Sequence, residues 1–86
     1  MAIFPLVCNL QGDYGYKVII ADDGDTVGDV IRMTNEQIGG VLVAPFPEGT
    51  VLKARLHDSE EPLAEDLVIK DAGFIQMEAL VIYAEA

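Results

Sequence analysis

One stretch of helical periodicity between strand-like runs constrains the fold of this chain more than any other feature. Between residues 27 and 38, apolar or near-apolar side chains recur with the i, i+3, i+4, i+7 spacing of a one-faced helix. Before it lie IFPLVCNL (3–10) and YKVIIA (16–21), joined by the turn sequence QGDYG, and this pattern predicts a hairpin. After it lie TVLKARLH (50–57) and MEALVIYAEA (77–86). One helix therefore has to cover one face of a sheet.

The order of these elements predicts an α+β fold of the β-grasp, or ubiquitin-like, type, formed by a single domain over residues 1–86. We expect a mixed sheet of four to five strands, including a short strand near 62–64, with one main helix over about 26–37 packed on one face. The last strand is expected beside the first at the centre of the sheet. A short helical turn is expected to end at Gly73. Pro5, inside the first strand, predicts an edge position or a bulge.

The acidic stretch ADDGDTVGDVI has two readings, a calcium loop or the entrance to the helix. Counted from Asp23, an EF-hand loop requires oxygen ligands at its fifth and twelfth positions, and these hold Val27 and Thr34. The closing bidentate carboxylate is thus missing. Asp25 or Thr26 is instead suited to cap the helix, and acidic side chains there favour the positive end of the helix dipole. We predict a helix entrance that binds no metal.

Composition narrows the classes of function. The chain carries a net charge of −10 but is 51% hydrophobic, whereas disordered acidic chains are poor in apolar residues. With five basic residues it is a poor match for nucleic acid or an anionic membrane surface. The sequence shows neither a signal peptide nor an apolar run long enough to span a membrane. We expect a folded cytoplasmic protein that binds neither nucleic acid nor membrane.

The residue types for catalysis are scarce. A carboxylate-bridged diiron site needs several Glu and two His on facing helices, and this chain has one predicted helix and one histidine, His57. Cys8 lies in a strand-like run, where cysteine is usually a small buried apolar residue. The acidic run over 58–66 is typical of a solvated loop. We therefore predict that this chain contributes no catalytic, metal-ligating or cofactor-binding residue.

The apolar strands suggest a different role. KVIIA and ALVIYA are apolar at consecutive positions, so both faces of the sheet carry apolar side chains, while one helix can cover only one face. An uncovered apolar patch commonly marks a protein interface. Phe46 lies between two prolines and is either an interface anchor or part of the core. The partner-binding candidates are Phe4, Pro5, Ile19, Phe46, Pro47, Val81 and Tyr83.

Several short motifs resemble a known family over essentially the whole chain. They are Phe4-Pro5, DTVGDV at 25–30, Ala44-Pro45, and the framework Leu63, Asp66, Ile69, Ala72, Gly73 and Glu78. In order and spacing they are similar to the small B (gamma) subunit of bacterial multicomponent diiron monooxygenases of the toluene-4-monooxygenase type.

The resemblance implies a non-catalytic subunit of a soluble hydroxylase that hydroxylates or epoxidises hydrocarbons, either aromatics or alkenes. Such a subunit docks on the large alpha subunit, which holds the diiron centre, in an assembly that also contains a beta subunit. This chain would itself hold no cofactor.

Two other functions fit the same fold. A ubiquitin-like adaptor or scaffold domain in an unrelated complex would also expose an apolar sheet face. A protein modifier or sulfur carrier would need a flexible Gly-Gly tail, whereas this sequence ends YAEA.

Overall fold

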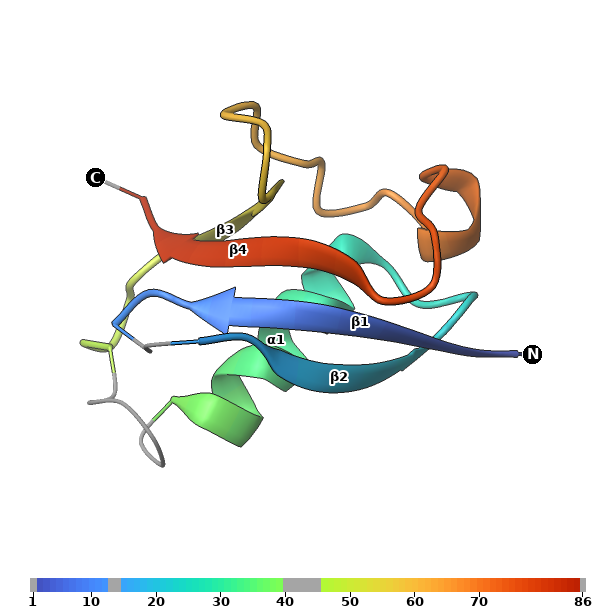
Figure 1. Ribbon diagram of the computed structural model, residues 1–86. Helices are drawn as coiled ribbons and strands as arrows, with labels where there is room; N and C mark the ends of the chain where they lie inside the picture. The colour runs from blue at the N-terminus through green and yellow to red at the C-terminus, as the bar shows by residue number, and fades with distance from the viewer. Residues whose placement is uncertain (1, 13–14, 40–45, 86) are drawn as a thin grey trace.

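The computed structural model describes residues 2–12, 15–39 and 46–85. Its elements, in chain order, are β1 (Ile3–Leu10), β2 (Lys17–Asp22), α1 (Val27–Ile38), β3 (Leu52–Leu56), the 3-10 helix η1 (Ile69–Asp71) and β4 (Glu78–Ala84). Figure 1 shows two layers, with the sheet in front and α1 lying across its rear face. This is the α+β arrangement that the sequence predicts.

The sheet has four strands in the order β2-β1-β4-β3. β1 pairs antiparallel with β2 and parallel with β4, and β3 pairs antiparallel with β4. The first and last strands therefore lie at the centre, as predicted. The short strand expected near 62–64 is reduced to one isolated bridge between Arg55 and Pro62 in the described chain. The 3-10 turn before Gly73 is present, and Gly73 has the positive φ of 75° that favours glycine.

The prediction that Pro5 marks an edge position or a bulge is wrong, because β1 is central and its pairing with β2 is in regular register at Pro5. Proline is tolerated here since the ladder between β1 and β4 begins one residue later, at Leu6 paired with Glu78. The Pro5 carbonyl still accepts a hydrogen bond of 2.8 Å from the Met77 N–H. The N–H that proline lacks thus falls where pairing with β4 has not yet started, so no regular ladder bond is lost.

Helix α1 begins with a reciprocal capping box. The Thr26 hydroxyl accepts from the Asp29 N–H at 3.2 Å, and the Asp29 carboxylate accepts from the Thr26 N–H at 3.0 Å. Of the two predicted caps, Thr26 is therefore the N-cap. Asp25 supports the preceding turn by accepting from the Asp22 N–H at 3.0 Å. The predicted apolar stripe of the helix is buried throughout: Val27, Val30, Ile31, Thr34 and Ile38.

The first two backbone N–H groups of the helix, which precede Asp29, donate to a segment distant in sequence. The Val27 N–H donates to the Leu67 carbonyl and the Gly28 N–H to the Glu65 carbonyl, both at 2.9 Å. In return, the Ile69 N–H donates to the Asp25 carbonyl at 2.8 Å. Two of the motifs that carry the family resemblance, DTVGDV and the framework around Ile69, are thus joined by backbone hydrogen bonds. These two motifs therefore stabilise the fold.

The core lies between α1 and the rear face of the sheet. On β1 the even-numbered side chains Leu6, Cys8 and Leu10 are buried, and Leu80 and Ile82 of β4 meet them in register. Burial raises the pKa of the Cys8 thiol to about 11, with a smaller opposing effect from a hydrogen bond to Thr34. A buried, protonated thiol is a poor nucleophile, so Cys8 serves as an apolar core residue.

Candidate protein-binding face

The front face of the sheet is apolar and has no helix over it. We call this surface the open face and define it by the apolar outward-pointing residues of the three strands β1, β2 and β4, with Asn9 and Asp22 as the polar outward positions at its ends. They alternate with the buried residues of each strand and pair across the ladders: Ile3, Pro5, Val7, Val18, Ile20, Ala79, Val81 and Tyr83. A solvent-facing side of an antiparallel strand pair normally carries polar residues at these positions.

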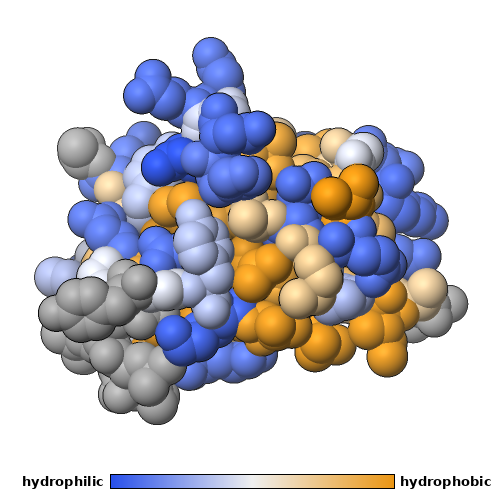
Figure 2. All heavy atoms as spheres, in the orientation of Figure 1, coloured by the Kyte–Doolittle hydropathy of each residue, from blue (hydrophilic) through white to orange (hydrophobic). Residues whose placement is uncertain are grey.

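Exposure is greatest over β1 and β2. The exposed fraction is 66% for Ile3, 49% for Val18 and 55% for Ile20. Figure 2, in the same orientation as Figure 1, shows orange side chains gathered over this part of the sheet. Large β-branched side chains left this accessible beside one another form a patch of the kind that marks an interaction surface.

The prediction of Ile19 as a surface anchor is wrong. Ile19 is fully buried in the core, and its neighbours Val18 and Ile20 are the exposed residues of the strand. The run Val18-Ile19-Ile20 is apolar at every position, so its pattern alone does not say which residues point outward. The hairpin register decides it, because Ile19 pairs with the buried Leu6.

The remaining predicted anchors divide between the two faces. Pro5, Val81 and Tyr83 belong to the open face and are half-buried by their neighbours. Phe4 and Phe46 pack against the core cluster instead, which favours the core reading of Phe46. Pro47, next to Phe46, is exposed. Whether any of these residues contacts a partner stays a prediction.

Sequence reasoning did not single out Ile3, Val7, Val18 or Ile20 for this face. The signal that could have identified them is Asn9, which suits an outward position and so suggests that the odd-numbered residues of β1 face solvent. Pairing a predicted hairpin then turns Val18 and Ile20 to the same side.

Basic residues border the open face along β3. Lys53 pairs with Tyr83 and Arg55 with Val81 across the ladder between β3 and β4. The Arg55 guanidinium donates to the carbonyls of Leu56, His57 and Ser59 at 3.2, 3.4 and 3.0 Å, which fixes the turn that follows β3. Arg55 is therefore a structural residue, whereas Lys53 presents its charge beside the apolar residues of β4.

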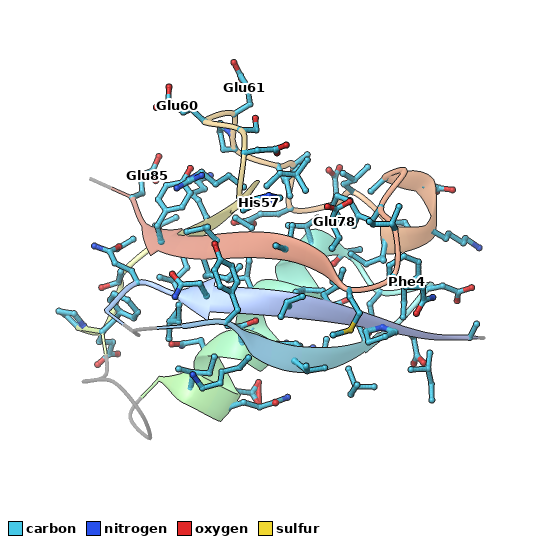
Figure 3. All side chains as sticks on the ribbon, viewed as in Figure 1. Phe4, His57, Glu60, Glu61, Glu78 and Glu85 are labelled. Carbon is cyan, nitrogen blue, oxygen red and sulfur yellow. The ribbon has the colours of Figure 1, made fainter. Side chains whose placement is uncertain are left out.

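Several carboxylates lie away from this surface. Glu60 and Glu61 project from the tip of the loop after β3, and this loop points away from β1 and β2 (Figure 3). On the helix, Asp29 and Glu36 pair with Arg32 at 3.4 and 3.2 Å, an exposed arrangement that adds little stability. These four carboxylates therefore lie outside the open face.

The other candidate groups do not come together. His57 is exposed in the turn after β3, while Cys8 is buried in the centre of the sheet. Within the described residues, no three His, Cys, Asp or Glu side chains lie close enough to hold a metal ion. The same part of the chain contains no helix with the length and apolar character needed to cross a membrane.

Two comparisons with solved structures agree on the fold class. A chain of "Toluene 4 monooxygenase HD Complex with Inhibitor 4-Bromobenzoate" superposes with a TM-score of 0.88 at 23% identity, covering 98% of this chain and 100% of that chain. The ubiquitin-like domain of the Mycobacterium tuberculosis type VII secretion system protein EccD1 gives a TM-score of 0.62 at 16% identity, covering 96% and 99%. The structure is thus a ubiquitin-like β-grasp domain that presents an uncovered sheet face.

The family follows from a sequence profile. The profile for toluene-4-monooxygenase system protein B matches residues 3–83, which is nearly the whole chain. No curated protein matches the chain significantly. The chain belongs to the toluene-4-monooxygenase system protein B family, and the resemblance identified from its motifs is confirmed.

Proposed function

We propose that this chain is the non-catalytic gamma subunit of a monooxygenase hydroxylase and that it docks on the other hydroxylase subunits through its open face. The family match supports membership of such a system, and it favours this role over an adaptor domain in an unrelated complex. The observation that carries the docking face is the set of exposed, uncharged β-branched side chains on β1 and β2. A similar chain belongs to the toluene 4-monooxygenase complex, which supports assembly with hydroxylase subunits.

The proposed division of labour places the diiron centre in the large alpha subunit of the partner, and the family match supports it. The described residues of this chain offer no ligand set for such a centre. A beta subunit completes the hydroxylase, and the assembly is cytoplasmic. Its substrates are hydrocarbons, aromatic or alkene, bound by the partner. What this chain supplies is an apolar docking surface.

The energetics of docking favour a few apolar contacts over the many carboxylates. Burying a large side chain at the centre of an interface contributes about 2 kcal/mol or more, whereas a charge at the rim contributes much less to affinity. Tyr83 is the aromatic residue of the open face and stands beside Lys53. The net charge of −10 then steers the chain toward a basic partner surface.

The test is co-purification of tagged variants with the hydroxylase, together with a melting curve of each isolated variant. Val81→Asp places a carboxylate in the open face, and Gln37→Asp places the same charge on the exposed side of α1 as a matched control. We expect Val81→Asp and Tyr83→Ala to reduce assembly by about thirtyfold, corresponding to about 2 kcal/mol. Gln37→Asp is expected to assemble normally.

Phe46→Ala separates the core from the interface. Because its ring packs on the core, this variant is expected to melt at a lower temperature, and any loss of assembly should follow from that. Normal assembly of folded Val81→Asp and Tyr83→Ala would show that the open face is not the docking surface.

A further inference from the structure

The two edges of the sheet differ in how they are protected. β3 carries two cations, Lys53 and Arg55, within five residues. Its outer side is partly covered, because the Leu63 N–H donates to the Ala54 carbonyl at 2.8 Å beside the bridge between Arg55 and Pro62. Charged side chains and a covering segment are the usual means by which proteins prevent an edge strand from pairing with another chain.

At the opposite edge, the backbone groups of Val18 and Ile20 in β2 have no partner strand among the described residues. The Asp23 N–H donates to the Ala2 carbonyl at 2.8 Å, and the ladder runs from Ile3 paired with Asp22 to Cys8 paired with Lys17. In an antiparallel strand, the backbone N–H and C=O groups of successive residues point alternately toward and away from the neighbouring strand. Because the Asp23 N–H bonds to β1, the backbone groups of Ala21 and Ile19 also point toward β1, and those of Val18 and Ile20 point away from it. Among the described residues, no segment pairs with this side of β2.

The charged residues of this edge strand, Lys17 and Asp22, stand only at its two ends. Between Lys17 and Asp22 the strand reads Val-Ile-Ile-Ala, without a charge, proline or described bulge. Val18 and Ile20, whose backbone groups face the edge, also carry exposed side chains on the open face. The edge and the open face therefore form one continuous surface, apolar in front and rich in backbone donors and acceptors at its side.

We propose that β2 pairs with an extended segment of the hydroxylase partner, which adds a fifth strand to the sheet. Main-chain bonds supply register in this mode of recognition, and alternate side chains supply specificity. We expect the partner segment to carry apolar side chains that extend the surface of Val18 and Ile20, and a basic side chain near Asp22. This inference rests on the proposed function, because it names the part of the partner that meets the open face.

Charge favours such a partner over a second copy of this chain. Two copies joined through β2 would each bring a net charge of −10, and both would place the acidic stretch Asp22–Asp25 near the shared edge. Repulsion between like charges opposes that complex, whereas a basic partner segment is attracted to the same carboxylates.

Proline at position 20 tests the proposal directly. Ile20→Pro removes the outward N–H and leaves the bonds between β1 and β2 in place, because the Ile20 N–H takes no part in that ladder. Ile20→Ala is the matched control, which shortens the side chain but keeps the N–H. We expect Ile20→Pro to bind the hydroxylase about tenfold more weakly than Ile20→Ala, since a partner carbonyl loses its donor. Equal binding by the two folded variants would overturn the proposal.

Amide hydrogen exchange of the wild-type chain gives a second readout that does not depend on folding of a variant. When the hydroxylase binds, the amides of Val18 and Ile20 are expected to become protected, while those of Ile19 and Ala21, already bonded to β1, should change little. Unchanged exchange at Val18 and Ile20 would refute strand addition. A dimer of the isolated chain in sedimentation, lost in Ile20→Pro, would identify a second copy as the occupant and so also refute the proposal.

These results separate the inference from the function on which it rests. If Val81→Asp abolishes assembly while Ile20→Pro behaves as Ile20→Ala, the open face docks but β2 adds no strand. If Val81→Asp and Ile20→Pro both assemble normally, neither the face nor its edge is the docking surface.

Discussion

Replacing Thr26 with alanine removes one half of the capping box that starts α1. In the structure, the Thr26 hydroxyl is the acceptor for the Asp29 N–H at 3.2 Å. Alanine offers no acceptor, so this N–H loses its partner within the protein. The other half of the box, from the Thr26 N–H to the Asp29 carboxylate, uses the backbone of residue 26 and survives the substitution.

The expected cost follows from what the rest of the helix entrance retains. Loss of a Thr cap typically costs 0.5–2 kcal/mol, usually about 1 kcal/mol. The Val27 and Gly28 donors keep their bonds to the Leu67 and Glu65 carbonyls, so the first turn remains largely satisfied. We therefore expect a loss of about 1 kcal/mol, which lowers the melting temperature of a domain of this size by about 4–8 °C.

The assay is thermal unfolding at neutral pH, with Thr26→Ser as the control that keeps a hydroxyl at the same position. Thr26→Ser is expected to melt within about 2 °C of the wild type, because serine caps at least as well as threonine. If Thr26→Ala melts with Thr26→Ser and the wild type, the hydroxyl does not cap the helix. If both variants fall equally, the methyl group of Thr26 is responsible.

Three further outcomes follow from the structure. The Thr26 backbone N–H, with smaller contributions from the Thr26 side chain and Arg32, lowers the pKa of Asp29. Asp29→Ala should therefore be less stable than the wild type at pH 7, and this difference should disappear as the pH falls below the ordinary pKa of 3.8. Equal stability differences at pH 7 and pH 2 in urea titrations would contradict this. Burial raises the pKa of Cys8 to about 11, so iodoacetamide at pH 8 should label the chain only in denaturant, and rapid labelling of the native protein would be the contrary result. Ile82→Ala should cost about 2–5 kcal/mol in urea unfolding, whereas Val81→Ala on the opposite face should cost much less.

Local patterns were sufficient for the main helix and the four strands that the structure describes. The helical stripe from Val27 to Ile38, the alternation of β3 and the strand-like ends of the chain each report on residues that are neighbours in sequence, and all were found where predicted. Their order then allows few compact arrangements, because one amphipathic helix must cover one sheet. The sequence GGVLVAPFPEG at 39–49 predicts a loop with short strand character, and its residues 40–45 lie outside the described residues.

The sequence by itself determined the elements, their order and the excess of apolar side chains that one helix cannot cover. Only the tertiary structure decided which side chains form that excess. In β2 the residues Val18, Ile19 and Ile20 are chemically alike, and a shift of one residue in register would exchange the buried and exposed faces. Pairing of Ile19 with the buried Leu6 fixed the choice, and the same pairing left the backbone of Val18 and Ile20 facing outward. Such a decision depends on residues more than ten positions apart, so no local pattern contains it.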